Sequence, residues 1–139
     1  MSNTCKEYYD LVRSDKGGVN WVLLSYETNS QIKVSAAGSG GVAELIPHLS
    51  PNDSSFAYLK VITGDQESRR SKFILITWTG ERTPIMRKAK MSVHKSEVKQ
   101  VFNSFSIEVQ TSDVADLAEP TLIAAVNKAG GANYNGQRA

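Results

Sequence analysis

The pattern of hydrophobic and polar positions predicts strands and helices arranged around one central hairpin. Two apolar runs, residues 56–62 and 73–78, are rich in β-branched and aromatic side chains and contain neither glycine nor proline. Such runs are typical of strands that are buried on both faces of a sheet covered by helices. A charged turn over residues 64–71 joins them. We therefore place this hairpin at the centre of the sheet.

Shorter patterns on either side predict the other elements. Thr4 and Glu7 have the spacing of a capping box, and apolar residues then recur every three or four positions, which predicts a first helix. The remaining elements are strands over 20–26, 31–37 and 106–110, a short helix over 42–49, and a broken C-terminal helix over 113–117 and 120–129 that ends at the glycine pair 130–131.

The segment after Gly80 predicts one long helix. Thr83 is the expected N-cap and Pro84 the first helical residue, where a missing N–H costs nothing. We expect a bend near Ser92, because serine back-bonding bends helices. The predicted buried face consists of Ile85, Ala89 and Val93, and then of Val98, Val101, Phe102 and Phe105. The predicted exposed face carries Lys88, Met91, Lys95 and Lys99.

This order of elements indicates an α/β chain of the α+β type, with one mixed sheet of about five strands and helices on both faces. The first four strands can be antiparallel neighbours. The last strand follows the long helix, and such a crossover makes it parallel to the strand it joins. We predict one domain over residues 1–131 and a polar tail over residues 132–139.

Composition is that of an ordinary globular protein. Of 139 residues, 40% are hydrophobic and 22% charged, which is enough for one sizeable core. The single cysteine excludes an internal disulfide and a cysteine-rich zinc site. The sequence has no apolar run of membrane-spanning length and no secretory signal pattern at its start, so we expect a cytoplasmic protein.

Charge is distributed unevenly along the chain. The whole chain has a formal net charge of +2, but residues 60–99 hold ten Lys and Arg against four Asp and Glu, a net of +6. The other residues therefore carry a net of −4. An asymmetry of this size favours an acidic partner, whether protein, nucleic acid or anionic lipid.

The sequence contains no pattern that indicates catalysis or metal binding. The two histidines, His48 and His94, lack partners at ligand spacing, and we interpret His94 and Glu97 as a surface pair on one helix. Cys5 falls on the inward side of the first helix, which favours a buried thiol. The glycine-rich loop over 38–41 lacks the residues of a phosphate-binding loop. We expect no enzyme, no cofactor and no metal.

Several segments resemble the coactosin group of the actin-depolymerising-factor homology (cofilin-like) family. They are TGDQESRRSKFILITWTGE at 63–81, KAGGANY at 128–134, Trp21-Val22 and Val98-Lys99, and the resemblance runs nearly from end to end. It implies a mixed sheet between helices. It also implies a non-catalytic protein that binds along the side of actin filaments. We expect this protein to be a monomer.

The resemblance also implies the residues that contact actin. They are Lys72, with Arg69 and Arg70 beside it, and Lys88, Lys95 and Lys99 on the long helix. We expect these cations to form one side-binding surface two elements wide. Few residues precede the predicted helix start at Thr4, so we also expect little severing of filaments and little sequestration of monomers.

A basic surface that binds nucleic acid or anionic lipid is the alternative. Aromatic residues on strands can stack bases, but Phe56, Tyr58, Phe73 and Trp78 lie on strands that we expect helices to cover. Nucleic acid is therefore not the expected partner. A weak contact with anionic lipid headgroups is compatible with actin binding.

Overall fold

The structure is a computed structural model that describes residues 3–64 and 67–138, with the backbone only for residues 131–138. Asp65, in the predicted charged turn, lies outside the described residues. The helices are α1 (Asn3–Arg13), α2 (Gly41–Leu45), α3 (Ile85–Val101) and α4 (Glu119–Arg138), with 3₁₀ turns η1 (Ile46–His48) and η2 (Val114–Leu117). The strands are β1 (Trp21–Thr28), β2 (Gln31–Gly38), β3 (Ser54–Thr63), β4 (Arg70–Thr79) and β5 (Ile107–Thr111).

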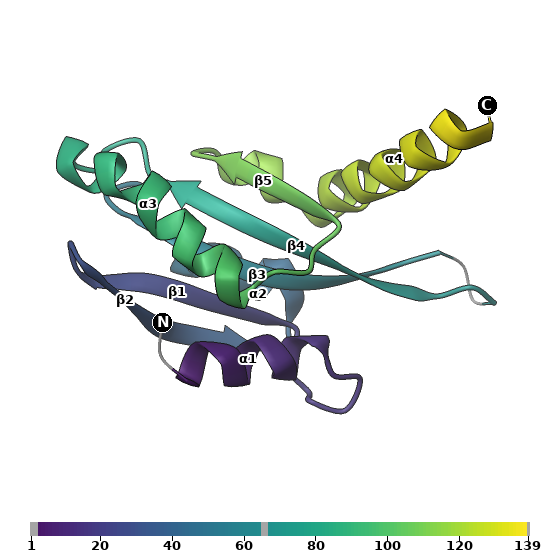
Figure 1. Cartoon of the computed structure of the whole chain (residues 1–139), viewed down its shortest axis with the longest axis horizontal. Helices are drawn as coiled ribbons and strands as arrows, with labels where there is room; N and C mark the ends of the chain where they lie inside the picture. Colours follow the sequence, from purple (N-terminus) through teal and green to yellow (C-terminus); the bar gives the residue numbers. More distant parts are fainter. Residues whose placement is uncertain (1–2, 65–66, 139) are drawn as a thin grey trace.

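The five strands form one mixed sheet in the order β2-β1-β3-β4-β5 (Figure 1). The pairs β1–β2, β1–β3 and β3–β4 are antiparallel, and β5 is parallel to β4. The predicted hairpin is confirmed as β3 and β4, with β3 in the middle of the sheet. Its register runs from Ser54 opposite Thr79 to Thr63 opposite Arg70. The parallel last strand, reached through α3, is also as predicted.

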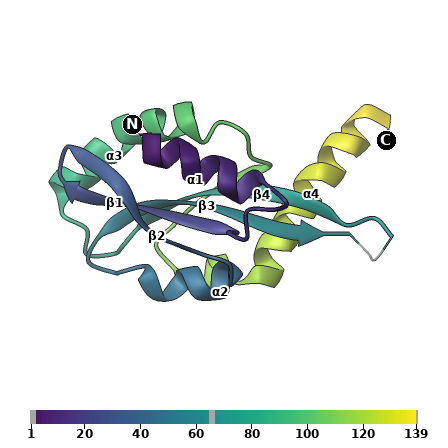
Figure 2. The same cartoon turned by 90° about the horizontal axis from the view of Figure 1, so that it is seen from below.

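Helices cover both faces of the sheet, as predicted (Figures 1 and 2). Because side chains alternate along a strand, β3 directs Phe56 and Tyr58 to one face and Ala57 and Leu59 to the other. The first pair packs with α1 and α3, and the second with α2 and α4. The core therefore has two layers, and one continuous hairpin belongs to both.

The C-terminal helix is longer than predicted. The glycine pair at 130–131 does not end it, and the predicted polar tail is helical as far as Arg138. A glycine inside a helix costs only about 1 kcal/mol relative to alanine, so it does not by itself interrupt the backbone hydrogen bonds. Leu122 and Val126 anchor the first turns of α4 in the core.

The start of α3 differs from the prediction. Pro84, not Thr83, is the N-cap, and no side-chain hydrogen bond caps the helix. The Thr83 hydroxyl is buried and has no hydrogen-bond partner among the described residues. The predicted cap is wrong because a turn bonds the Thr83 N–H to the Gly80 carbonyl at 3.0 Å and directs the side chain inward.

The predicted buried face of the first half of α3 is also wrong. Ile85 is 85% exposed and Val93 63% exposed. The residues that α3 buries are Met91, His94 and Val98. The first half of the helix is thus turned with its apolar side toward solvent, and the polar contacts described below account for this orientation.

This orientation has a measurable consequence for stability. We expect Val98→Ala to lower the free energy of unfolding by about 1.5–3 kcal/mol, because it removes apolar volume from the core. Val93→Ala on the same helix should change it by less than about 0.5 kcal/mol, because that side chain is exposed. Urea unfolding of both variants measures the difference, and equal losses would contradict the orientation of α3.

Candidate functional site

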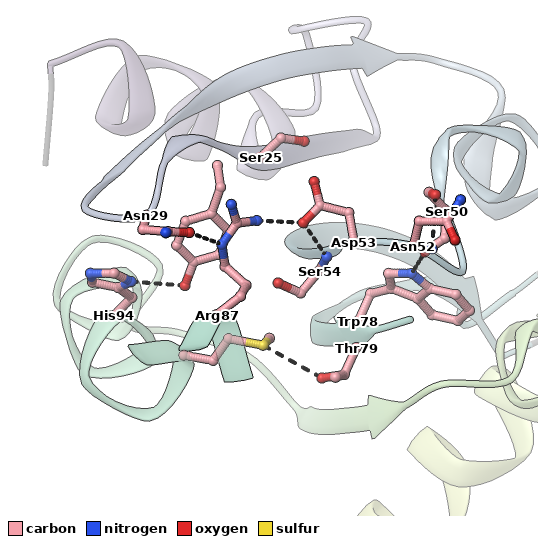
Figure 3. A network of polar contacts seen from close by, with 12 residues as sticks. Ser25, Asn29, Ser50, Asn52, Asp53, Ser54, Trp78, Thr79, Arg87 and His94 are labelled. Carbon is pink, nitrogen blue, oxygen red and sulfur yellow. Dashed lines mark hydrogen bonds and ion pairs between the residues drawn. The ribbon is translucent and has the colours of Figure 1, made fainter. Parts of the chain in front are cut away.

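Arg87 fixes the first half of α3 against the sheet through polar contacts (Figure 3). Its Nε donates a hydrogen bond of 3.0 Å to Asn29 Oδ1, in the turn between β1 and β2. Its Nη1 forms an ion pair with Asp53, just before β3. The guanidinium also lies over the Tyr26 ring, 4.2 Å from the centroid, where a cation is attracted to the aromatic face. One side chain therefore links α3 to three separate segments.

His94 makes the next contact along the same side of α3. Its Nδ1 and the Tyr26 hydroxyl are hydrogen-bonded at 2.8 Å, and the ring centroids are 5.3 Å apart. Burial raises the pKa of Tyr26 to about 12, which keeps the phenol protonated at neutral pH. The prediction of a surface pair between His94 and Glu97 is wrong, because His94 is buried.

These contacts leave an apolar stripe of α3 exposed to solvent. Ile85, Met86 and Val93 are 85%, 61% and 63% exposed, and Ala89 is exposed between them. We call these four residues the α3 stripe. Among the described residues, half of the exposed large hydrophobic side chains lie on this helix. A cluster of this kind on one helix makes it the candidate interaction surface.

Sequence reasoning missed the α3 stripe because it assigned Ile85, Ala89 and Val93 to the core. One signal was present in the sequence. The apolar residues of the first half are out of phase by one residue with Val98 and Phe102 in the second half. A bend in one buried face was inferred from this shift. The structure shows instead that the two sets lie on different sides of the helix.

The three predicted lysines of α3 have different surroundings. Lys88 is exposed beside the α3 stripe and makes no ion pair with any residue that the structure describes. Lys95 and Lys99 share the carboxylate of Glu108 on β5, with a distance of 3.0 Å from Lys95 Nζ to Oε2. Met91, predicted beside these lysines on the exposed side, is buried.

Further contacts hold the two paired lysines against β5 and the segment before it. Lys95 Nζ also donates to Gln110 Oε1 at 3.4 Å. Lys99 Nζ lies 5.6 Å from the centroid of the Phe105 ring. The hydrogen bond from Lys99, followed by the contacts from Lys95, lowers the pKa of Glu108. The carboxylate is therefore ionised at neutral pH and offsets part of the lysine charge.

The predicted cations of the hairpin lie on another part of the molecule. Lys72 stands opposite Val61 in the register and Arg70 opposite Thr63. Since Lys72 and Ile74 alternate with Phe73, Lys72 and Arg70 point to the face that carries α2 and α4. Arg69 and Arg70 are exposed, and Lys72 is half-buried.

The expectation of one surface two elements wide is therefore wrong. The hairpin extends from the sheet away from the start of α3 (Figures 1 and 2), and α3 covers the opposite face of the sheet. The cations form two groups: a helix group of Lys88, Lys95 and Lys99, and a hairpin group of Arg69, Arg70 and Lys72.

Other types of site have no support in the described part of the chain. It contains no cluster of histidine, cysteine and carboxylate residues that could hold a metal ion. None of its helices is long and apolar enough to cross a membrane. Phe56, Tyr58 and Trp78 are buried, and Phe73 stacks on Tyr58 with ring centroids 5.7 Å apart. These aromatic rings are not available to stack on bases.

Comparison with known proteins gives one family. The profile of the cofilin/tropomyosin-type actin-binding proteins matches residues 1–127. The chain belongs to this family. Coactosin of Dictyostelium discoideum is 43% identical over 138 residues, which cover 99% of this chain and 94% of that protein. Human coactosin-like protein is 36% identical over 135 residues, covering 96% and 92% of the two chains.

Solved structures of family members have the same fold. A crystal structure of human coactosin-like protein superposes with a TM-score of 0.84 at 34% identity, covering 91% of this chain and 95% of that one. Mouse coactosin, described as an actin filament binding protein, gives a TM-score of 0.79 at 36% identity, covering 99% and 95%. The predicted resemblance to the coactosin group is confirmed. The alternative of a nucleic-acid or lipid module gains no support from these relatives.

The arrangement around Glu108 in this family member can be tested by titration. We expect the carboxyl carbon of Glu108 to titrate in NMR with a midpoint below the ordinary value of 4.5, because Lys99 and Lys95 stabilise its ionised form. Lys99→Met should raise the midpoint.

The sign of the stability effect follows from the lowered pKa. Glu108 contributes stability above its unfolded pKa, and this contribution is lost as the pH falls through the lower folded pKa. A midpoint at or above 4.5, or one that Lys99→Met leaves unchanged, would contradict the pairing.

Proposed function

We propose that this protein binds along the side of actin filaments as a non-catalytic monomer in the cytoplasm. The observation that carries the proposal is the exposed α3 stripe, which lies on a chain of an actin-binding family. A helix that exposes Ile85, Met86 and Val93 while turning Arg87 toward the sheet leaves these apolar side chains without a use inside its own fold. The apolar surface is best explained by a partner that covers it.

The apolar and charged parts of the surface have different roles. Burial of the α3 stripe supplies affinity at roughly 25 cal/mol per Å² of apolar surface removed from water. Lys88 borders the stripe and is attracted to the acidic surface of actin. Exposed charges of this kind speed the encounter and fix the register of binding more than they add affinity.

The hairpin group provides a second contact at a distance from the first. Lys72 and Arg70 lie on the face of the sheet opposite α3, on a hairpin that extends away from the start of that helix (Figure 1). Two separate contact regions fit a partner that surrounds the protein on more than one side. Neighbouring subunits of a filament offer such a surface and one monomer does not, which favours the filament as the partner.

The α3 stripe is tested by making it polar. We expect Ile85→Ser combined with Val93→Ser to weaken binding to filaments about thirtyfold or more in cosedimentation, because interface residues that matter cost more than about 1 kcal/mol each when truncated. Val114→Ser is the matched control, since Val114 is an exposed apolar residue on η2. The control should bind as wild type, and equal losses in both proteins would contradict a specific role of α3.

The hairpin group is tested by reversing the charge of Lys72. We expect Lys72→Glu to abolish cosedimentation and leave the free energy of unfolding unchanged, because Lys72 is only half-buried, and a long side chain at such a position can keep its charged end in water. Lys33→Glu makes the same charge change on the edge strand β2 and should still pellet. A folded Lys72→Glu protein that pellets at the wild-type level would remove Lys72 from the contact.

A further inference from the structure

We propose that Glu108 limits the affinity of the α3 surface by competing with the acidic partner for Lys95 and Lys99. This inference rests on the proposed function, because it concerns the same surface and the same partner. Glu108, on β5, would then affect binding although it is negatively charged, like the partner. Glu108 is thus an affinity-limiting residue built into the binding surface.

The geometry places the three lysines of α3 on one side of the helix. Lys88, Lys95 and Lys99 are separated by seven and four residues, which at 3.6 residues per turn brings them into one row. Lys88 lies in that row, next to the α3 stripe, and is exposed. Lys95 and Lys99 could extend the same positive border along the stripe if their ammonium groups were free.

Contacts within the protein hold both ammonium groups elsewhere. The two oxygens of Glu108 each accept one lysine, and Gln110 and Phe105 provide further contacts on the same side. The side chains of Lys95, Lys99 and Glu108 are 27%, 40% and 28% exposed. The cluster has two positive charges and one negative charge, so an approaching acidic surface meets a net of +1 in place of +2.

The ion pairs between Glu108 and the two lysines are weak enough for a partner to replace them. Ion pairs this close to solvent are worth little, about 0–1 kcal/mol each, so a carboxylate of the partner can replace Glu108. The exchange leaves the Glu108 carboxylate unpaired and facing an acidic surface, which is unfavourable because like charges repel. Binding therefore includes the cost of breaking the cluster and of this repulsion. Lys88, which has no such partner among the described residues, incurs neither cost.

The experiment is filament cosedimentation with Glu108→Gln, which keeps the shape of the side chain and removes its charge. We expect a dissociation constant about two- to fivefold lower than that of wild type at low salt, the range that suits weak, exposed pairs. The difference should shrink between about 0.05 and 0.3 M salt, because the Debye length shortens over that range. Urea unfolding confirms that the variant is folded.

Glu97→Gln is the matched control for net charge. Glu97 also lies beside Lys95 and Lys99 in the sequence, on α3 itself, but it forms no ion pair within the described part of the chain. Its substitution removes the same charge without releasing a lysine, so it should change the dissociation constant by less than twofold. A second control is Glu108→Gln in a Lys95→Gln/Lys99→Gln background, where the gain should disappear.

The outcomes separate this inference from the function on which it rests. A tighter Glu108→Gln protein, with both controls as stated, supports the competition. Unchanged or weaker binding overturns it, as does an equal gain for Glu97→Gln or a gain that survives without the two lysines. If wild type itself does not pellet with filaments, the proposed function falls, and that result is distinct from any change among the variants.

Discussion

The orientation of α3 depends on the contacts that Arg87 makes with Asp53, Asn29 and the Tyr26 ring. A buried or half-buried ion pair adds little net stability, because removing two charges from water offsets most of their attraction. It can nevertheless decide between two orientations of a helix, since burying Arg87 without its partners would be far more costly. The pair together with His94 therefore determines which side of α3 meets the sheet.

The exposed apolar surface of α3 is a consequence of that orientation. With Arg87 and His94 turned inward, Ile85 and Val93 are turned outward and the helix presents apolar groups to solvent. In a helix that packs only for its own stability, the apolar residues would face the core. The protein thus exposes apolar surface that its own fold does not use, as expected for a helix whose role is to bind a partner.

The two-layered core explains why the helix group and the hairpin group of cations are separate. The hairpin β3–β4 lies between the two layers, so its inner part is buried on both faces while its outer part extends beyond α1, α2 and α3 (Figure 2). Cations at this tip and cations on α3 are attached to one rigid sheet, yet they face different directions. Lys72 and Lys88, which are 16 positions apart in the sequence, therefore face different sides of the molecule.

The sequence determined the central hairpin, the mixed sheet, its parallel last strand and the helices on both faces, because these follow from local periodicity and chain connectivity. It also determined which lysines and arginines carry the positive charge. Only the tertiary structure decided that Ile85 and Val93 face solvent and that Lys95 and Lys99 pair with Glu108. Those outcomes depend on residues distant in the sequence, such as Asp53 and Glu108, whose contacts do not follow from the periodicity of a single helix.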